Sequence, residues 1–404
     1  MRIAYIVPWF WRKPRSTASE YHLELVSELG RNGNKIQVFC FSDDSQESLV
    51  NVSDNVIIKS LPPNRLNWPT LLNIWKSLKR RLPYAILKYD VGALYKVINQ
   101  AYSDPSEKPN IALLAHIESS SYASLFQTVN VPVLLHLHDI EAMRYRLAGQ
   151  ENRSELMRLL FRFEARRMLA YELATVQKII TACLSEEERN FIQKLLPERK
   201  IGIVPLGLNL SRYPFEPANT HNNKILFVGP ADYYKNEVSI SWFVKNVYPL
   251  ILKLWPEGIL RVVNVKYGSP VDQLIRSYPR TETTQFVSNV QSEMLSAAVT
   301  IAPMRIASGV SGRVLSSLAI GAPMVATSLA CQGLNVKNGQ HLLIADEPKE
   351  FANAVVSYAI AMKNNKRERM LMRGRAYIEE HHDIRKVASL LEDTLVRIIE
   401  DFCH

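Results

Sequence analysis

The sequence is poor in cysteine, with four residues at Cys40, Cys183, Cys331 and Cys403. No two of them form a CxxC pair, so neither a disulfide framework nor a thiolate metal site is indicated. We therefore expect reduced thiols and a cytoplasmic location.

Long hydrophobic runs are also missing. No window of 18 uncharged apolar residues occurs, which excludes a membrane-spanning helix but not attachment to a bilayer surface. The apolar run at the N-terminus is broken by Pro8 and has no small-residue cleavage pattern. We interpret it as a first strand and not as a signal peptide.

Two nucleotide-binding motifs are absent. Without a GxGxxG fingerprint a nicotinamide oxidoreductase is disfavoured, and without GxxxxGK[ST] so is a P-loop NTPase. No nucleic-acid recognition motif accompanies the positive charge of the chain, so nucleic acid is not expected as a partner.

The composition, with 47% hydrophobic residues in 404, predicts two domains with a core each. Short Val, Ile and Leu-rich runs alternate with helical stretches, which is typical of parallel sheets in doubly wound α/β domains. The first series is 2–7, 35–41, 55–61, 110–116, 131–138, 178–183 and 201–207. The second series is 224–229, 259–265, 284–288 (TQFVS), 299–305, 323–328 and 342–346. Residues 205–223, rich in Pro, Asn and Ser, are the expected linker, and ligands are expected in the cleft between the domains.

Positive charge is concentrated in residues 65–97. The chain has a net charge of +10, and this segment holds seven basic residues against Asp90, or +6. Trp68, Trp75 and Leu78 lie among them at helical spacing, which favours an amphipathic helix on an anionic membrane surface. A solvated face over an ordinary core helix is the alternative.

A candidate phosphate site follows the run 299–305. Ser308, Gly309, Ser311 and Gly312 allow backbone N–H groups to approach an anion where a helix is expected to begin, near Gly312. Arginines flank these residues and would form charge-assisted bonds to phosphate oxygens: Arg305 and Arg313. Ordinary helix capping is the alternative interpretation.

The motifs together resemble a known family. They are LFVGPADYYKN (226–236), QFVSNV (285–290), APMRIASGVSGRVLSSLAIGAPMVATSLACQGL (302–334), NGQHLLIADEPKEFANAV (338–355), HLHDIEAMRYR (136–146), EARRMLAYE (164–172) and IVPLGLNLSRY (203–213). The chain resembles the retaining glycosyltransferases of family 4 (glycosyl transferases group 1), which have the GT-B fold of two Rossmann-like domains facing each other across a cleft.

The resemblance implies an acceptor-side domain, 1–208, and a domain that binds a nucleotide-diphosphate sugar, 209–383. A closing helix at about 384–404 would pack back on the first domain. It also implies a metal-independent, retaining transfer without cofactor to a glycan or lipid-linked hydroxyl, as in polysaccharide biosynthesis.

The resemblance also suggests roles for single residues. His138 would orient the donor sugar, and Arg305 and Arg313 would stabilise the leaving diphosphate, with these three as the catalytic group. The remaining donor-binding candidates are Gly229, Lys235, Ser308, Gly309, Ser311, Gly312 and Ser316. The acceptor-side candidates are Arg12, Thr17, Asp139 and Arg144.

The chain departs from the family at the donor site. Many relatives have two Glu residues where this chain has Ser308 and Ser316, and a hydroxyl offers the ribose fewer acceptors than a carboxylate. Thr17 and Ala18 replace glycines of an N-terminal loop, and the interdomain Asn-Gly is Leu206-Gly207. An enzyme of lower donor affinity and a catalytically degenerate, binding-only relative are both compatible with these changes.

A zinc metallohydrolase is a remote alternative. His136 and His138 share a strand face, and Asp139 and Glu141 follow them. Their spacing does not match the order HxHxDH, so no metal ligand is assigned.

Overall fold

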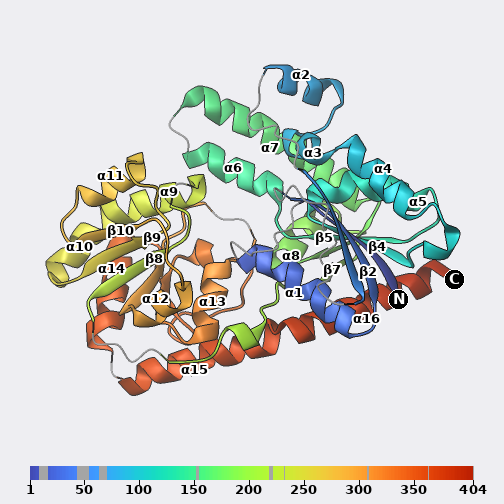
Figure 1. Cartoon of the computed structure of the whole chain (residues 1–404). Helices are drawn as coiled ribbons and strands as arrows, with labels where there is room; N and C mark the ends of the chain where they lie inside the picture. The colour runs from blue at the N-terminus through green and yellow to red at the C-terminus, as the bar shows by residue number, and fades with distance from the viewer. Residues whose placement is uncertain are drawn as a thin grey trace. The chain divides into compact units, whose positions relative to one another are not determined.

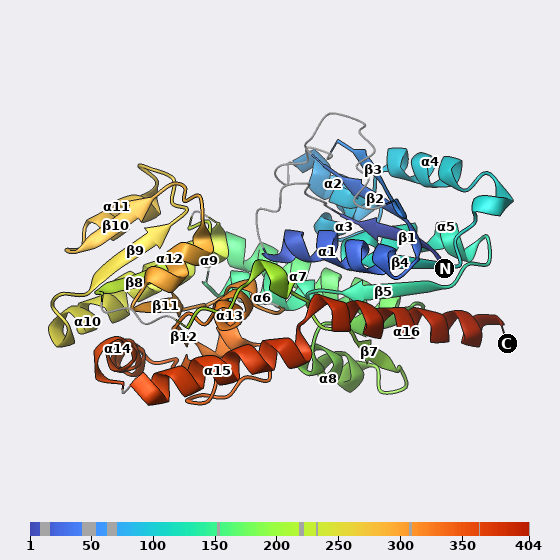
Figure 2. The same ribbon diagram turned by 60° about the horizontal axis from the view of Figure 1, so that its bottom comes forward.

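The computed structural model describes residues 1–8, 17–42, 54–62, 71–151, 154–217, 222–231, 233–306, 309–362 and 364–403. The chain divides into two compact units (Figures 1 and 2). Unit 1 comprises Met1–Gly207 and Ile384–His404, and unit 2 comprises Leu208–Asp383.

In its described residues unit 1 contains a parallel sheet of seven strands in the order β3-β2-β1-β4-β5-β6-β7. The strands are β1 (Arg2–Val7), β2 (Lys35–Phe41), β3 (Val56–Leu61), β4 (Ile111–Ala115), β5 (Val133–Leu137), β6 (Ile180–Cys183) and β7 (Ile201–Ile203). Every residue of β4 and β5 is buried, because helices cover both faces of the sheet. All seven expected strands are confirmed.

The helices of unit 1 connect these strands. They are α1 (Thr17–Arg31), α2 (Leu71–Lys79), α3 (Tyr84–Tyr89), α4 (Gly92–Ala101), η1 (Pro105–Glu107), η2 (Ile117–Tyr122), α5 (Ala123–Gln127), α6 (Glu141–Glu151), α7 (Glu155–Val176), α8 (Glu186–Leu195) and α16 (Ile384–Cys403). The closing helix α16 packs on α1, where Nδ2 of Asn32 and of Asn34 donate to the Glu392 carboxylate at 2.8 Å (Figure 2). The expected return of the C-terminus to the first unit is confirmed.

In its described residues unit 2 contains a parallel sheet of six strands in the order β10-β9-β8-β11-β12-β13. The strands are β8 (Lys224–Val228), β9 (Ile259–Val263), β10 (Thr281–Thr284), β11 (Val299–Ala302), β12 (Met324–Ala326) and β13 (Leu343–Ile344). The helices are η3 (Leu210–Arg212), α9 (Tyr234–Trp242), η4 (Phe243–Val247), α10 (Tyr248–Leu254), α11 (Pro270–Arg276), α12 (Val290–Ser296), α13 (Gly312–Ile320), η5 (Ser328–Cys331), α14 (Pro348–Val356), η6 (Ser357–Ala361) and α15 (Asn364–His381). The doubly wound fold class is therefore confirmed in both units.

One strand prediction is wrong. The run TQFVS (284–288) is not a strand; the edge strand β10 ends at Thr284, and Phe286 is 78% exposed. The true strand, TETT, is half-buried and among the described strands pairs with β9 alone, so it carries little of the apolar signal that marks a central strand.

The amphipathic helix expected within 65–97 corresponds to α2, which ends at Lys79 and does not continue through the rest of the segment. The described part of this segment forms α2, α3 and the first part of α4. Arg81 has a positive φ of 54°, and Pro83 directly precedes α3, so the helix cannot continue through them. Trp68 lies outside the described residues, whereas Trp75 and Leu78 of α2 are 56% and 47% exposed.

Each sheet reverses its winding at one point. In unit 1 the reversal lies between β1 and β4, and in unit 2 between β8 and β11. The loops that leave the carboxyl ends of such strand pairs run in opposite directions, and ligands of doubly wound folds bind in the crevice that results. Among the described helices, none is long and apolar enough to cross a membrane.

Candidate functional site

The reversal point of unit 2 gathers most of the predicted donor-site residues. Gly229 directly follows β8, Arg305 lies three residues after β11, and α13 begins at Gly312 as expected. These segments share one edge of the sheet because β8 and β11 are parallel neighbours.

The N-terminus of α13 is free of side-chain capping by its own N-cap residue. Ser311 occupies the N-cap position, and its side chain accepts no hydrogen bond from the helix. Gly309 precedes it with a φ of 70°, a conformation that few L-residues adopt. The N–H groups of a first turn carry partial positive charge and can bind an anion. Ser308 lies outside the described residues.

Arg313, in the first turn of α13, is held mainly by protein groups. Its Nε donates to the carbonyl oxygen of Val228 at 2.5 Å, and its Nη2 donates to Oδ1 of Asn236 at 3.3 Å. The guanidinium lies 4.4 Å from the centre of the Phe227 ring. Burial lowers the pKa of Arg313 to about 10, so the side chain stays charged at neutral pH. Its charge is directed at the turn after β8.

Gly229 is required by this packing. It has a φ of 139°, and a Cβ at this position would lie 2.5 Å from Nη2 of Arg313. The side chain of Asn236 completes the turn by donating from Nδ2 to the carbonyl oxygen of Pro230 at 3.0 Å. Gly229 therefore allows the guanidinium to approach the backbone closely.

Arg305 differs from Arg313 in its environment. Its backbone N–H donates to Oγ of Ser239 at 3.1 Å, and its guanidinium lies 5.0 Å from the centre of the Trp242 ring. Among the described residues no protein acceptor receives a hydrogen bond from this guanidinium. Stacking on Trp242 leaves the edge of the guanidinium plane, which carries its donors, for a ligand.

The other two predicted donor residues lie in helices. Ser316 is buried within α13, and Lys235 of α9 is half-buried, with Nζ 5.8 Å from the centre of the Tyr233 ring. Asp232, three residues before Lys235, lies outside the described residues.

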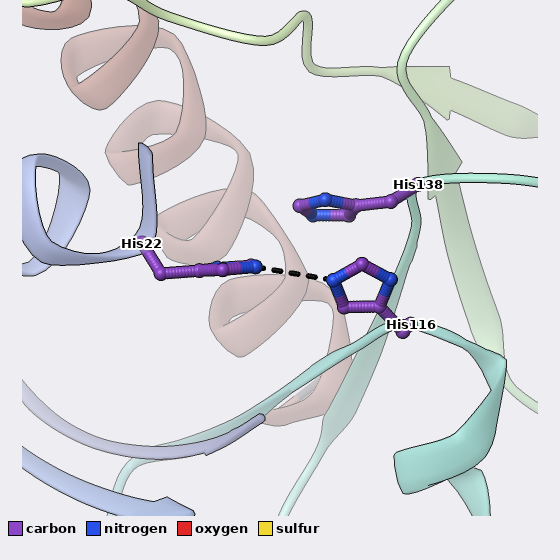
Figure 3. A group of neighbouring side chains, drawn as sticks. All are labelled: His22, His116 and His138. Atoms are coloured by element: carbon purple, nitrogen blue, oxygen red, sulfur yellow. Dashed lines mark hydrogen bonds between the residues drawn. The ribbon is translucent and has the colours of Figure 1, made fainter. Parts of the chain in front are cut away.

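The reversal point of unit 1 gathers histidines (Figure 3). His116 follows β4 directly, His138 follows β5, and His22 projects from α1. The Nε2 atoms of His22 and His116 are 3.1 Å apart, and the rings of His22 and His138 stack at 4.9 Å. All three side chains are buried.

Hydrogen bonds orient two of these rings. Nε2 of His136 lies 2.9 Å from the carbonyl oxygen of Val204, and Nε2 of His138 lies 3.3 Å from Nδ1 of His136. On the other side of the cluster the hydroxyl of Tyr5 lies 2.5 Å from Nδ1 of His22.

Burial lowers the pKa of each histidine in this group. It lowers the pKa of His116 to about 3 and that of His136 to about 4. The pKa values of His22 and His138 also fall well below the ordinary range, mainly by burial and further through the neighbouring histidines. The four rings are therefore neutral at physiological pH.

The predicted acceptor-side residues lie beside this cluster or outside the described part. Asp139 directly precedes Ile140 and α6, and Nε of Arg144 donates to Oε2 of Glu141 at 2.9 Å. Oε1 of Glu172 accepts the backbone N–H of Glu141 at 2.7 Å, so α7 caps the start of α6. Thr17 is the first residue of α1, and Arg12 lies outside the described residues.

Sequence reasoning missed several residues that the fold brings to these two sites: His22, His116, Asn236, Ser239 and Trp242. A signal existed for one of them, because His116 ends an apolar strand in the same way as His138 ends the next. Nothing local marks the others, since their partners lie far away in the sequence.

Comparison with known protein families gives a match within unit 2. Residues 222–359 match the family Glycosyl transferases group 1. A protein of Klebsiella pneumoniae, an uncharacterized 44.6 kDa protein in the cps region, is 22% identical over 269 residues, or 63% of this chain. The chain spans 66% of that protein, slightly less than two thirds of its length.

Solved structures with the same fold cover nearly the whole chain. Sucrose-phosphate synthase from Thermosynechococcus elongatus superposes with a TM-score of 0.74 at 15% identity and covers 99% of both chains. HepE of Anabaena, in complex with UDP and glucose, has a TM-score of 0.66 at 14% identity over 98% of this chain and 99% of its own. A glycosyltransferase from Rickettsia africae has a TM-score of 0.64 at 13% identity over 98% of both chains. The chain thus has the GT-B fold, and its matched region, 222–359, supports a glycosyltransferase of group 1.

Proposed function

We propose that the protein is a glycosyltransferase that moves a sugar from a nucleoside diphosphate to a hydroxyl of a glycan or lipid-linked acceptor. The observation that carries this proposal is the α13 N-terminus at the reversal point of unit 2, together with Arg305 three residues after β11, whose guanidinium is stacked on Trp242 with its edge unpaired among the described residues. This arrangement suits a diphosphate, because the backbone N–H groups of the helix and the planar guanidinium of Arg305 can both bind phosphate oxygens.

The proposed transfer proceeds with retention and without metal at the diphosphate. The acceptor oxygen forms a bond to the anomeric carbon while the bond from that carbon to the diphosphate oxygen breaks. The departing phosphate oxygen takes the acceptor's proton on the same face of the sugar. The protein positions the reactants and stabilises the leaving anion, which is the larger part of such catalysis.

Each of the three residues predicted to be catalytic has a role in this proposal. Arg305 binds the diphosphate directly, whereas Arg313 places its charge under the Gly229 turn and positions the loop that faces the phosphates. His138 orients the donor sugar as a neutral hydrogen-bonding group. The UDP and glucose bound by HepE support a uridine diphosphate hexose as the first donor to test.

The test is calorimetry of the full chain with UDP, GDP, TDP and ADP, with and without EDTA. We expect one of these nucleotides to bind equally well in EDTA, and Arg305→Ala to weaken its binding by about tenfold or more, or at least ~1.4 kcal/mol. Arg373→Ala, at an exposed position of α15, is the matched control and should change nothing. Absence of binding for every nucleotide, or equal binding by Arg305→Ala, would contradict the site.

A catalytically degenerate relative is the second candidate, and the substitution of Ser316 for an expected Glu favours it. Such a protein would bind the nucleotide and leave the sugar bond intact. Incubation with a nucleotide sugar distinguishes the active transferase from the degenerate relative. An active transferase should slowly hydrolyse the donor to free sugar and nucleotide even without its acceptor, whereas the degenerate relative should leave the donor intact.

We propose further that unit 1 attaches to the surface of an anionic membrane from the cytoplasmic side. Two exposed helical faces support this: Trp75 and Leu78 on α2, and a row on the first half of α7. The α7 row consists of Leu156, Leu159, Leu160 and Phe163, which are 67%, 60%, 44% and 51% exposed.

Hydrogen bonds link the two helices that carry these faces. Arg167 of α7 joins them by donating from Nη1 to Oγ of Ser77 at 2.9 Å and from Nη2 to the carbonyl of Leu82 at 2.7 Å. Basic residues lie on both helices, Lys76 and Lys79 on α2 and Arg162 and Arg166 on α7, and Arg80 and Arg81 follow α2 in the next turn. Apolar side chains mixed with cations are the composition of an interfacial surface.

Co-sedimentation with vesicles tests this attachment. Binding to anionic vesicles should exceed binding to neutral vesicles and fall with salt, because salt screens exposed charges. The triple change of Lys79, Arg80 and Arg81 to Gln should weaken it. The matched control replaces three exposed lysines of unit 2 by Gln: Lys245, Lys253 and Lys349. Equal binding to both vesicle types would refute the attachment.

A further inference from the structure

The histidine cluster of unit 1 has the composition of a transition-metal site. One ring nitrogen from each of His22, His116 and His138 lies within 4.8 Å of the other two. We propose that these three side chains bind a divalent transition metal of the Zn²⁺ class, with water as the fourth ligand. Nothing in the family match or in the related structures assigns a metal to these residues.

The hydrogen bonds around His138 leave it with a lone pair for a metal. The carbonyl of Val204 can only accept, so Nε2 of His136 carries the proton and its Nδ1 is an acceptor. Nε2 of His138 must therefore donate to Nδ1 of His136. In neutral His138 the remaining nitrogen, Nδ1, then has no proton and can coordinate a metal.

His22 shows the same arrangement on the opposite side of the cluster. Its Nδ1 lies 2.5 Å from the Tyr5 hydroxyl, whose oxygen can accept a hydrogen bond from Nδ1–H, so that Nε2 is left to coordinate. A metal-binding histidine commonly donates its second N–H to such a partner, which sets the tautomer and the orientation of the ring. Both His22 and His138 are thus held by partners outside the cluster.

The spacing of the nitrogens is close to that of a tetrahedral site. Two ligands at a Zn–N distance of about 2.05 Å lie roughly 3.3 Å apart in tetrahedral geometry. The Nε2 atoms of His22 and His116 are 3.1 Å apart, and a nitrogen of His138 lies within 4.8 Å of the others, so an approach of at most about 1.5 Å would bring it to tetrahedral spacing. Imidazole ligands suit zinc, copper, nickel and iron, and three of them with one open position are typical of a zinc site.

The backbone at His116 supports a positioned ligand. This residue has a φ of 64° and a ψ of 153°, a combination that is nearly confined to glycine. The chain leaves β4 in this conformation, and the imidazole faces His22 and His138 (Figure 3). Strained residues of this kind persist where their surroundings hold them, and they gather at binding sites.

A bound metal would connect three segments of unit 1 that are distant in the sequence: α1, the end of β4 and the end of β5. It would bind the folded state only, so unit 1 should unfold at a higher temperature when the metal is present. Nucleotide binding by unit 2 does not involve these residues. If the protein is the glycosyltransferase proposed above, a metal bound to His138 would also prevent that side chain from contacting the donor sugar.

The experiment uses the full chain with any affinity tag removed, treated with EDTA and desalted. Zn²⁺ is titrated by calorimetry and Co²⁺ by visible absorption, because four-coordinate Co²⁺ absorbs far more strongly than six-coordinate Co²⁺. We expect one equivalent of either metal, a four-coordinate Co²⁺ spectrum and a higher melting temperature with Zn²⁺. His22→Gln should lower the affinity at least about 100-fold, and the control His381→Gln, at an exposed position, should leave it unchanged.

A second variant keeps the proposal testable if His22→Gln does not fold. Tyr5→Phe keeps the ring and its packing, removes only the partner of His22 Nδ1, and should lower the affinity about 10- to 100-fold. Absence of a stoichiometric site, a six-coordinate Co²⁺ spectrum, or unchanged affinity in folded His22→Gln or Tyr5→Phe would each overturn the proposal. Arg305→Ala should bind the metal normally, so the metal site and the nucleotide site fail independently.

Discussion

Gly229→Ala perturbs the unit-2 site at its tightest point. The new Cβ would lie 2.5 Å from Nη2 of Arg313, whereas ordinary contacts begin at 3.4 Å. The guanidinium cannot simply swing away, because it donates to Val228 and Asn236 and lies against Phe227. The substitution must therefore break at least the longer hydrogen bond, the one to Asn236.

The expected cost has two parts. Breaking a hydrogen bond of a charged group costs about 1.5 to 3 kcal/mol. Placing an L-residue at a φ of 139°, outside the left-handed helical region, adds roughly 1 to 3 kcal/mol. Together they predict a loss of about 2.5 to 6 kcal/mol in the free energy of unfolding of unit 2, a large fraction of the stability of a typical domain.

The assay must report on unit 2 alone, because the chain contains two units. Hydrogen exchange of the amides in β8 and α13 at increasing urea concentrations gives this free energy locally. Gly268→Ala is the matched control, since Gly268 has a φ of 73° and a Cβ there would meet nothing within 4 Å. It should cost only the backbone part, about 1 to 2 kcal/mol.

A double-mutant cycle with Arg313→Met isolates the contact itself. Methionine removes the guanidinium, so the double variant should be less destabilised than the sum of the single variants by about 1 kcal/mol or more. Equal costs for Gly229→Ala and Gly268→Ala, together with additivity in the cycle, would refute the assigned packing of Arg313 under this turn.

Two further predictions concern single carboxylates. Ser316→Glu should tighten nucleotide binding by about tenfold, or ~1.4 kcal/mol, because a carboxylate can accept hydrogen bonds from both ribose hydroxyls. A 2'-deoxynucleotide, which lacks one of these hydroxyls, should gain less. Loss of nucleotide binding in a folded Ser316→Glu variant would contradict our assignment of Ser316. Burial raises the pKa of Glu188 to about 8, so the folded state holds a proton that the unfolded chain releases above its ordinary pKa of 4.5. The stability of the wild type should therefore fall relative to Glu188→Gln as the pH rises from 4.5 to 8, by on the order of 4 kcal/mol, and parallel pH profiles in urea unfolding would refute this shift.

Much of the fold could be predicted from local sequence patterns. The all-apolar runs that became β4 and β5 are strands buried on both faces, and their alternation with helices permits few topologies other than parallel sheets. The start of α13 at Gly312 was also predicted, because Gly and Ser precede its apolar face. The pattern failed at β10, where an edge strand of four polar residues needs no apolar signal.

The candidate sites depended on the sequence only in part. The sequence marked Arg305 and His138 because each lies at or soon after the end of an apolar strand, and it marked Arg313 because this residue follows the Ser and Gly run at the expected helix start. It did not reveal that Arg313 packs under Gly229, nor that His22 and His116, 94 residues apart, bring their nitrogens within 3.1 Å. Those pairings arise because the carboxyl ends of parallel strands lie at one edge of a sheet. Which loops meet there is decided by the strand order, and strand order is a property of the crossover connections that no local stretch of sequence contains.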